Sequence, residues 1–365
     1  MDQGQAVDVV YYDFSKAFDL VPHNKLSVKL QQAGVCDKVN LWIKQWLHNR
    51  RQKVVLNGQS SEWADVESGV PQGSVLGPIL FILFINDIGD GLEGVLSIYA
   101  DDTKHIYPVN SKHDASVLQS EIDLLDQWAT TWDMKFNSTK CAVMHFGRNN
   151  QEHEYYLGNS TLNSTKAEKD VGVIVQENLK FDQHCKKVVN KCNQIIGQVW
   201  RSFENKEPGI MLDIYHTYIL PHIDYGISVW YPHLQRDIDM LESIQRRFTK
   251  MITGMNGLTY EERLTVLELP TLEDRRLKLD LIQAYRIWKG IDKIDCQLFT
   301  TASSVNTKST RGSTKLNFLA EKTSLSQRKH FFSNRVVNSW NSLPKHVQTA
   351  KNLSSFKSLL KTILF

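Results

Sequence analysis

Three aspartates stand directly after short apolar segments, and this placement is the feature that most constrains the fold. Asp13 follows residues 7–12, a β-branched and aromatic run typical of a buried strand. Asp101 and Asp102 come just after residues 95–99, a second strand-like run. Carboxylates at the ends of buried strands repel one another, and loss of water raises their pKa values. A bound divalent cation would remove both costs, because hard oxygen ligands suit Mg²⁺.

Carboxylates brought together from two strands could hold a pair of Mg²⁺ ions ~3.5–4 Å apart, with Mn²⁺ as an alternative metal. That arrangement serves in-line phosphoryl and nucleotidyl transfer. The alternative interpretation is that each aspartate is a turn residue or a helix N-cap, which is common for a single aspartate. The spacing by itself leaves both interpretations open.

The first 180 residues are predicted to mix strands with helices. The Asn57-Gly58 pair indicates a tight turn that joins strands 53–56 and 63–66 into a hairpin. Residues 68–74 are rich in turn-forming residues. Further strands are expected at 7–12, 95–99, 105–109 and 141–146, a second hairpin at 155–162, and helices at 25–33, 40–48, 75–85 and 118–132.

Helical patterns dominate from residue 182 to residue 290, and the Ser/Thr/Asn-rich residues 300–314 are predicted to form a linker. The end of the chain is basic. Residues 301–365 carry eleven lysines and arginines against one acidic residue, although the whole chain has a net charge of only +3. Such a segment suggests salt-sensitive contact with a polyanion, and a solvated basic face explains it equally well.

The cysteines favour a reducing, intracellular compartment, because they are odd in number and none forms a C-x-x-C pair. Two of them, Cys185 and Cys192, lie near His184 and could suggest a metal site. Without a second close pair, ordinary helix residues are the preferred interpretation, and no structural zinc is expected. The five cysteines are Cys36, Cys141, Cys185, Cys192 and Cys296.

The longest apolar run, residues 75–85, contains Gly77 and Pro78 and falls short of the ~20 residues that a membrane span requires. The first five residues are polar and acidic, unlike the start of a secretory signal. We therefore expect a soluble intracellular protein without membrane contact, located in the nucleus, the cytoplasm or both.

Four segments carry a strong family resemblance. They are VVYYDFSKAFDLVPH (residues 9–23), SGVPQGSVLGPILFILFINDI (68–88), YADD (99–102) and KFNSTKCAVMHFG (135–147). Their order and spacing resemble four palm motifs of reverse transcriptases. Their amino-acid sequences are similar to those of non-LTR (LINE-type) retrotransposons of the jockey and chicken-repeat groups. The resemblance continues past the palm and covers nearly the whole chain, through residues 246–254, 258–282 and 335–344.

The resemblance implies an α+β fold, in which residues 1–180 form a right-hand polymerase palm with helices backing an antiparallel sheet. An all-helical thumb or connection would follow over residues 181–299, then the linker at 300–314 and a basic C-terminal segment at 315–365. Only twelve residues precede Asp13. The fingers of the family are therefore expected to be largely missing, as in a chain truncated at its N-terminus.

The activity implied by the resemblance is that of an RNA-directed DNA polymerase. Such an enzyme extends a DNA primer on an RNA template, using deoxynucleoside triphosphates and two metal ions. Asp13 and Asp101 resemble the shared metal ligands, and Asp102 a weaker neighbour that orients the metal or the primer end. Lys140 stands where the family has a lysine that protonates the leaving pyrophosphate. Taken alone, Lys140 would be a solvated residue before a strand.

Three residues resemble the nucleotide site of the family. Phe18 is similar to the bulky gate under the incoming sugar, where a ribose 2′-hydroxyl would overlap the ring. Gln72 and Gly73 are similar to the segment that packs against the new base pair, because glycine permits close backbone approach. The alternatives are a core aromatic for Phe18 and an ordinary turn for residues 71–73.

The resemblance also implies contacts with the template and primer. Leu157 and Gly158 fall where the family has its primer-gripping hairpin. Arg246, Arg247 and Lys250 suit phosphate contacts from a thumb, which would track the duplex without reading bases. A charged face of a packed helix explains these three basic residues equally well.

A second interpretation belongs to a different class of protein. The chain would then be a non-catalytic nucleic-acid-binding remnant of a retroelement, in which the acidic residues are inherited relics. Binding of structured RNA without metal-dependent synthesis would support this interpretation.

We expect the isolated chain to polymerise poorly or not at all. The basic residues that hold the triphosphate in the family lie upstream of the first motif, and such positioning supplies much of the catalysis. Primer extension on a poly(rA) template with dTTP measures the activity. Robust synthesis that Asp101→Ala abolishes would contradict the expectation.

Overall fold

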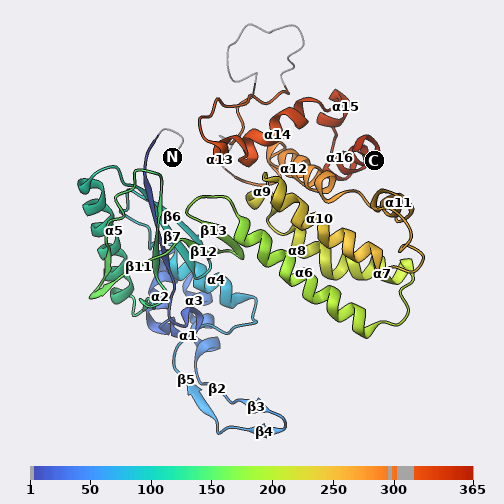
Figure 1. Cartoon of the computed structure of the whole chain (residues 1–365). Coiled ribbons are helices and arrows are strands. Elements are labelled where there is room, and N and C mark those ends of the chain that lie inside the picture. Colours follow the sequence, from blue (N-terminus) through green and yellow to red (C-terminus); the bar gives the residue numbers. More distant parts are fainter. Residues whose placement is uncertain (1–3, 295–297, 302–315, 365) are drawn as a thin grey trace. The chain divides into compact units, whose positions relative to one another are not determined.

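The computed structural model describes residues 4–294, 298–301 and 316–364, and the chain divides after Gly172 into two compact units (Figure 1). The first unit is organised around a β-sheet, whereas the second is mostly helical. The chain is thus a mixed α/β structure.

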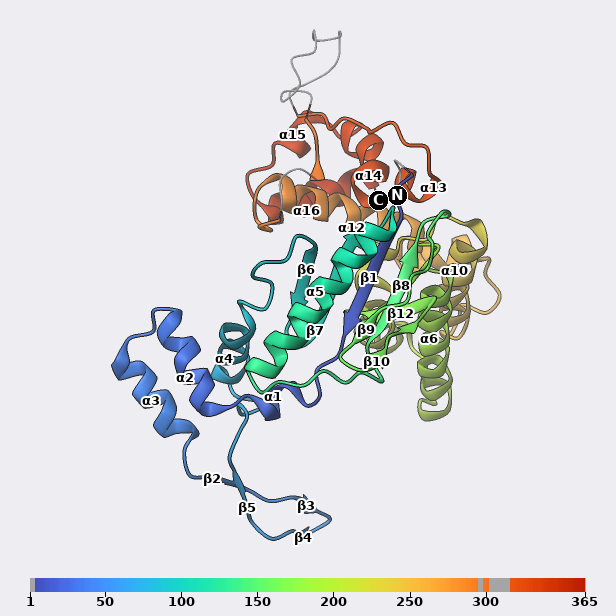
Figure 2. The same cartoon turned by 90° about the vertical axis from the view of Figure 1, so that its left-hand side faces the viewer.

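Strand β1 (Val7–Tyr12) lies at the centre of a sheet that has five strands among the described residues (Figure 2). β7 (Asp102–Pro108) pairs with it on one side and β8 (Ala142–Phe146) on the other, both antiparallel. β6 (Val95–Tyr99) pairs antiparallel with β7, and β11 (Asn163–Ser164) pairs parallel with β8. The end of β1 therefore lies beside the turn that connects β6 to β7.

Helices cover one face of this sheet. Val10 and Tyr12 of β1 are buried in a core to which α5 (Lys112–Thr131), α2 (His23–Gln32) and α4 (Leu76–Ile85) also contribute. Burial of this apolar surface is the main force that holds the layers together. Because alternate residues of a strand face opposite sides, the odd-numbered residues of β1 face away from this core.

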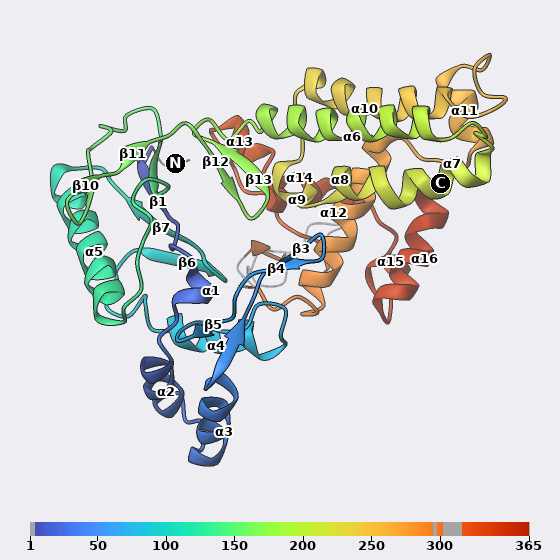
Figure 3. The same ribbon diagram turned by 90° about the horizontal axis from the view of Figure 1, so that it is seen from below.

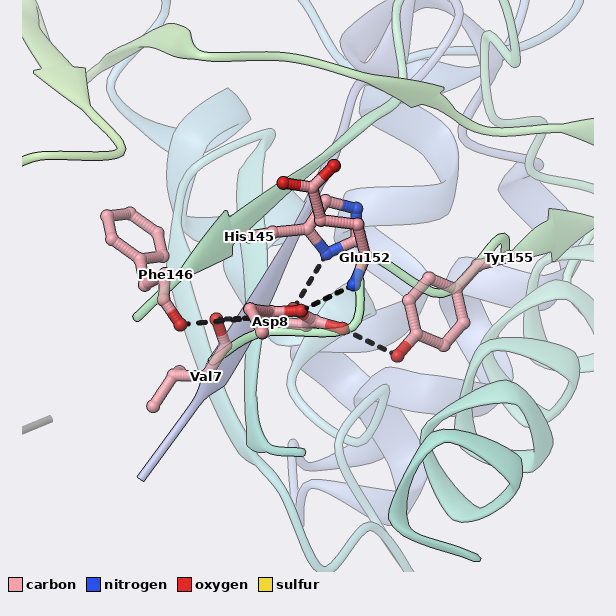
Figure 4. A network of polar contacts seen from close by, with 7 residues as sticks. Val7, Asp8, His145, Phe146, Glu152 and Tyr155 are labelled. Carbon is pink, nitrogen blue, oxygen red and sulfur yellow. Dashed lines mark hydrogen bonds and ion pairs between the residues drawn. The ribbon is translucent and has the colours of Figure 1, made fainter. Parts of the chain in front are cut away.

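Asp8 lies on the buried face of β1 and accepts three hydrogen bonds (Figure 4). Tyr155 Oη, Asn150 Nδ2 and His145 Nδ1 lie 2.6, 2.7 and 2.8 Å from its carboxylate oxygens. Burial raises the pKa of Asp8, but these hydrogen bonds together outweigh burial and lower its pKa below the usual value. The network ties the start of β1 to the end of β8 and to the loop that follows.

The predicted turn at Asn57-Gly58 is confirmed, but the predicted pairing of residues 53–56 with 63–66 is wrong. Both turn residues have positive φ angles, 50° and 81°. A two-residue turn of this kind pairs the residues directly beside it, which leaves the more distant segment to another partner. The observed pairs are β3 (Val55–Leu56) with β4 (Gln59–Ser60), and β2 (Arg50–Gln52) with β5 (Ala64–Val66).

Most other predicted elements of the first unit are confirmed within a few residues. Two elements begin earlier than predicted. The strand expected at 105–109 starts at Asp102, which leaves only Ala100-Asp101 as the loop, and the helix expected at 118–132 starts at Lys112. β12 had no counterpart among the predictions. The remaining elements are α1 (Ala17–Leu20), α3 (Asp37–Leu47), β9 (Tyr156–Leu157), β10 (Ser160–Thr161) and β12 (Ala167–Asp170).

The second unit contains the predicted helical region (Figure 3). Among the described helices, none is long and apolar enough to cross a membrane. After strand β13 (Val173–Gln176), the first elements are α6 (Asp182–Ser202), α7 (Pro208–Ile214), the π-helical turn Tyr215–Ile219, α8 (Leu220–Asp224), α9 (Ile227–Trp230) and α10 (Gln235–Lys250). The later ones are α11 (Tyr260–Val266), α12 (Leu272–Trp288), α13 (Ser326–Lys329), α14 (Phe332–Asn341), α15 (Lys345–Gln348) and α16 (Leu353–Leu364).

The basic C-terminal segment shares a core with α12. Tyr285 is buried and donates a hydrogen bond to the carbonyl of Ala350 at 2.7 Å. Arg335 pairs with Asp280 at 2.7 Å, so that one of the basic residues neutralises a buried acid. Of the predicted linker at 300–314, all but the first two residues lie outside the described residues.

His184, Cys185 and Cys192 are buried residues of α6. His184 Nδ1 accepts a hydrogen bond from the backbone N–H of Ile174 at 3.1 Å, and its ring packs edge-on against Trp230. Burial raises the pKa of both thiols to about 12. The helix-residue interpretation accounts for all of these contacts.

We predict that acid destabilises the second unit through His184. Burial, with a smaller contribution from the charge of Lys187, lowers its pKa from 6.5 to about 4. The folded state therefore resists protonation that the unfolded chain accepts, and stability is lost as the pH falls from 6.5 towards 4. The loss from this histidine should reach about 3 kcal/mol.

Urea unfolding followed by circular dichroism at a series of pH values measures this effect. His184→Asn is the matched variant, because an amide oxygen can still accept the Ile174 N–H but does not titrate. Equal pH dependence of the unfolding free energy in both proteins would refute the assignment.

Candidate active site

Asp13 and Asp102 lie side by side at one end of the sheet. Tyr12 pairs with Thr103 at the end of β1, and Asp13 and Asp102 are the residues that come next along the two strands. Both line a cavity of about 130 Å³. The residues around it are Tyr11, Tyr12, Asp13, Ser97, Tyr99, Asp102, Thr103, Lys104, Lys140, Glu168, Lys169, Asp170 and Val171.

Asp101 lies at the tip of the adjoining hairpin. Tyr99 and Asp102 pair directly, so that Ala100 and Asp101 alone form the connection between β6 and β7. Ala100 has a φ of 55°, a left-handed conformation that costs energy for a residue with a Cβ. The structure thus brings Asp101 to the same end of the sheet, but not into the lining of the cavity.

The Asp13 side chain is held near Lys140. Lys140 Nζ lies 3.2 Å from Asp13 Oδ2, and the two side chains are 64% and 39% exposed. The Oδ2 atom itself is buried, and the Lys140 ammonium is its partner in this ion pair. The backbone N–H of Asp13 points to Cys141 Sγ at 3.4 Å, and Asn137 N–H donates to the Asp13 carbonyl at 2.7 Å.

Negative charge accumulates around Asp102. Burial raises its pKa, and the nearby carboxylates of Asp101, Asp170 and Asp13 raise it further. Burial, together with Asp170 and Glu168, also raises the pKa of the Tyr11 phenol. An environment that opposes ionisation in this way is suited to a cation.

A cation fits this end of the sheet chemically. Asp13 offers a buried oxygen whose partner, the Lys140 ammonium, shows that positive charge is accepted there, and the crowding of carboxylates around Asp102 would be relieved by positive charge. Across residues 4–294, 298–301 and 316–364, however, no three histidine, cysteine or acidic side chains are grouped as a ready metal site.

Sequence reasoning missed the acidic residues Glu168 and Asp170 in the cavity wall. They belong to β12, a short and polar strand that carries no hydrophobic alternation. Lys104 was also missed, although the alternation along β7 puts it on the same face as Asp102. It forms an ion pair with Asp170.

Phe18, Gln72 and Gly73 are brought close to one another but do not line the cavity. The backbone of the 68–74 loop is fixed to the segment after β1, with Val70 N–H donating to the Phe18 carbonyl at 2.7 Å. Gln72 Nε2 lies 3.4 Å from Asp19 Oδ1. The Phe18 ring stacks on that of Phe81, with the ring centroids 4.6 Å apart.

Leu157 and Gly158 lie beside α5 and not in the cavity. Leu157 is buried in the core of the first unit. A Cβ placed on Gly158 would come within 3.3 Å of Asp126 Oδ2, so this turn sits close to the helix. The cavity wall is lined instead by residues 168–171.

The three basic residues of α10 are exposed and belong to the second unit. The Arg246 guanidinium lies over the Tyr260 ring, 4.9 Å from its centroid. Arg247 Nη1 donates to Asn193 Oδ1 at 3.0 Å. These contacts hold the two arginines on the helix surface, and Lys250 is the third exposed base.

Residues 2–181 match the family of the reverse transcriptase (RNA-dependent DNA polymerase). These residues are a reverse transcriptase domain. The match covers the whole sheet and the cavity at its end. The resemblance of the four sequence motifs to this family is therefore confirmed.

Curated relatives of this reverse transcriptase domain come from mobile elements of Drosophila melanogaster. The probable RNA-directed DNA polymerase from transposon X-element is 27% identical over 69% of this chain and 29% of its own length. The RNA-directed DNA polymerase from mobile element jockey is 27% identical over 67% of this chain and 28% of its own length. The chain thus spans less than a third of either relative.

Among solved structures, the reverse transcriptase domain has distant neighbours. An apo telomerase of Candida tropicalis, truncated from its C-terminal domain, is 15% identical over 47% of this chain and 34% of its own, with a TM-score of 0.32. The telomerase of Candida albicans in complex with a telomeric RNA fragment is 10% identical over 78% and 44%, with a TM-score of 0.30. Neither likeness is close enough to bear on the ligands of this chain.

We predict that Gly69→Ala destabilises the reverse transcriptase domain by about 2–4 kcal/mol. Gly69 has a φ of 87°, and a Cβ there would lie 2.7 Å from the backbone of Asp19. Gly73→Ala is the matched control, since its φ of 81° is similar but no described atom lies within 4 Å of the added Cβ. It should cost only about 1 kcal/mol. Denaturant unfolding of both variants tests the difference, and equal losses would contradict the close approach.

Proposed function

We propose that this chain carries the catalytic centre of an RNA-directed DNA polymerase of a non-LTR retrotransposon. The observation that carries the proposal is that Asp13, just after β1, and Asp102, at the start of β7, line one cavity together with Lys140. The family match of residues 2–181 supports the reaction class. The names of the jockey and X-element relatives support the element type.

In this proposal Asp13, Asp101 and Asp102 hold two Mg²⁺ ions, or Mn²⁺ in their place. When bound, such ions lower the cost of charge developing on the attacking oxygen and on the transferred phosphate. Asp13 and Asp102 already lie together, so that only the hairpin tip with Asp101 needs to turn toward the cavity.

Residues of this chain would hold the Asp13 carboxylate in place and donate a proton to the leaving group. Lys140 lines the cavity with a largely exposed side chain, and it can exchange its contact with Asp13 for one with a phosphate oxygen. Its ammonium would then give a proton to the leaving pyrophosphate. The Cys141 thiol and the backbone N–H of Asn137 hold the backbone of Asp13 in place. The Asp13 carboxylate is therefore positioned before the reaction, which lowers the entropic cost of the step.

The incoming deoxynucleotide would meet Phe18, Gln72 and Gly73. Phe18 is held by its stacking on Phe81, and a ring fixed in this way can exclude a 2′-hydroxyl by volume. The loop carrying Gln72 and Gly73 is joined to the Phe18 segment by backbone hydrogen bonds, which makes the three residues one structural element.

The substrates in this proposal are an RNA template, a DNA primer and deoxynucleoside triphosphates. Residues 1–180 would act as the palm and 181–299 as the thumb, with a basic C-terminal segment at 315–365. Contacts with the duplex are assigned to two groups of residues. These are the exposed turn at Gly158 for the primer, since the Leu157 side chain is buried in the core and can only support that turn, and Arg246, Arg247 and Lys250 for phosphates.

We predict that the unchanged chain extends a primer on poly(rA) with dTTP weakly but in a Mg²⁺-dependent way, and that Asp13→Asn, Asp101→Asn and Asp102→Asn each lower this incorporation roughly 100-fold or more. Loss of a carboxylate removes charge that the metal ions require. The measurement is radiolabelled dTMP incorporation per mole of protein.

The matched control is Asp90→Asn, which changes an exposed aspartate that does not line the cavity. It should leave incorporation unchanged. Binding of structured RNA that persists while no protein shows metal-dependent synthesis would overturn the proposal in favour of a non-catalytic remnant.

A further inference from the structure

The cavity wall holds a second ion pair that the proposed chemistry leaves unused. Lys104 of β7 pairs with Asp170 at the end of β12, and the two side chains are only 26% and 17% exposed. Lys104 follows Asp102 by two residues on the same strand, so that both side chains leave β7 on the same face. The pair therefore stands next to the proposed metal ligand.

Asp170 lines the same cavity as Asp13 and Asp102, so that its charge lies beside the proposed metal ligands. Lys104 offsets that charge, just as Lys140 offsets the charge of Asp13. The charged side chains that line the cavity are Asp13, Asp102, Glu168 and Asp170 against Lys104, Lys140 and Lys169.

We propose that Lys104 is a positioning residue that, by pairing with Asp170, sets the balance between cation and triphosphate binding in the cavity. This inference rests on the proposed function. A divalent cation and a polyphosphate carry opposite charges, so one added negative charge strengthens the binding of the first and weakens that of the second. The Lys104–Asp170 ion pair neutralises the Asp170 carboxylate and keeps the net charge of the cavity wall small.

Opposite shifts of two affinities are the expected result. In Lys104→Ala the Kd for Mn²⁺ should fall roughly three- to tenfold, and the Kd for dTTP should rise by a similar factor. Asp170→Asn removes the negative partner and should shift both constants in the reverse directions. The double variant restores the net charge and should return both constants close to those of the unchanged chain.

The experiment uses the full chain. Electron paramagnetic resonance of free Mn²⁺ gives the metal affinity, and equilibrium dialysis of dTTP at saturating Mn²⁺ gives the nucleotide affinity. Lys104→Arg keeps the charge and should behave like the unchanged chain. Thermal unfolding of every variant shows whether it is folded.

A purely structural role would give a different pattern. If the pair only anchored β12, each single variant and the double variant would weaken both affinities, and that result would overturn the inference. The Asp13→Asn variant distinguishes failure of the proposed function from failure of this inference. If the unchanged chain binds Mn²⁺ no better than Asp13→Asn, the proposed function fails. If it does bind better but Lys104→Ala causes no opposite shifts, the inference alone fails.

Discussion

The antiparallel pairing of β1 with β7 is the constraint on which the rest of the first unit depends. It brings Asp13 and Asp102 to one cavity, although nearly ninety residues separate them in the chain. β8 pairs with the other side of β1 and delivers Lys140 and Cys141 to the same end. A slip of this pairing by one residue would turn every side chain of β1 to the other face.

The acidic residues of the sheet lie in two different environments. Asp8 on the helix-covered face is satisfied by three neutral or histidine donors, which makes it part of the core. At the end of the sheet, Asp13 pairs with the largely exposed Lys140, and burial with like charges opposes ionisation of Asp102. The first arrangement stabilises the fold, whereas the second leaves binding capacity for a cation.

Much of the first unit could be predicted from the sequence, because strong local signals coincide with it. Apolar runs located β1, β6 and β8, and the Asn57-Gly58 pair located its turn. What the sequence did not show was long-range pairing. β12 is short and polar, so nothing local indicated that Glu168 and Asp170 would reach the cavity or that Lys104 would meet a carboxylate there. The two-residue loop that sets Asp101 apart from the lining is also visible only in the register.

Asp8 of β1 and Asp13, just after the strand, are five positions apart, and this odd spacing has an evolutionary consequence. Asp8 must point into the helix layer, and Asp13 must reach the opposite side at the strand's end. Inserting or deleting one residue between them would force a choice between an unsatisfied acid inside the protein and the loss of the acid at the cavity. We therefore expect insertions and deletions between Asp8 and Asp13 to be tolerated far less than exchanges of one apolar residue for another in this segment.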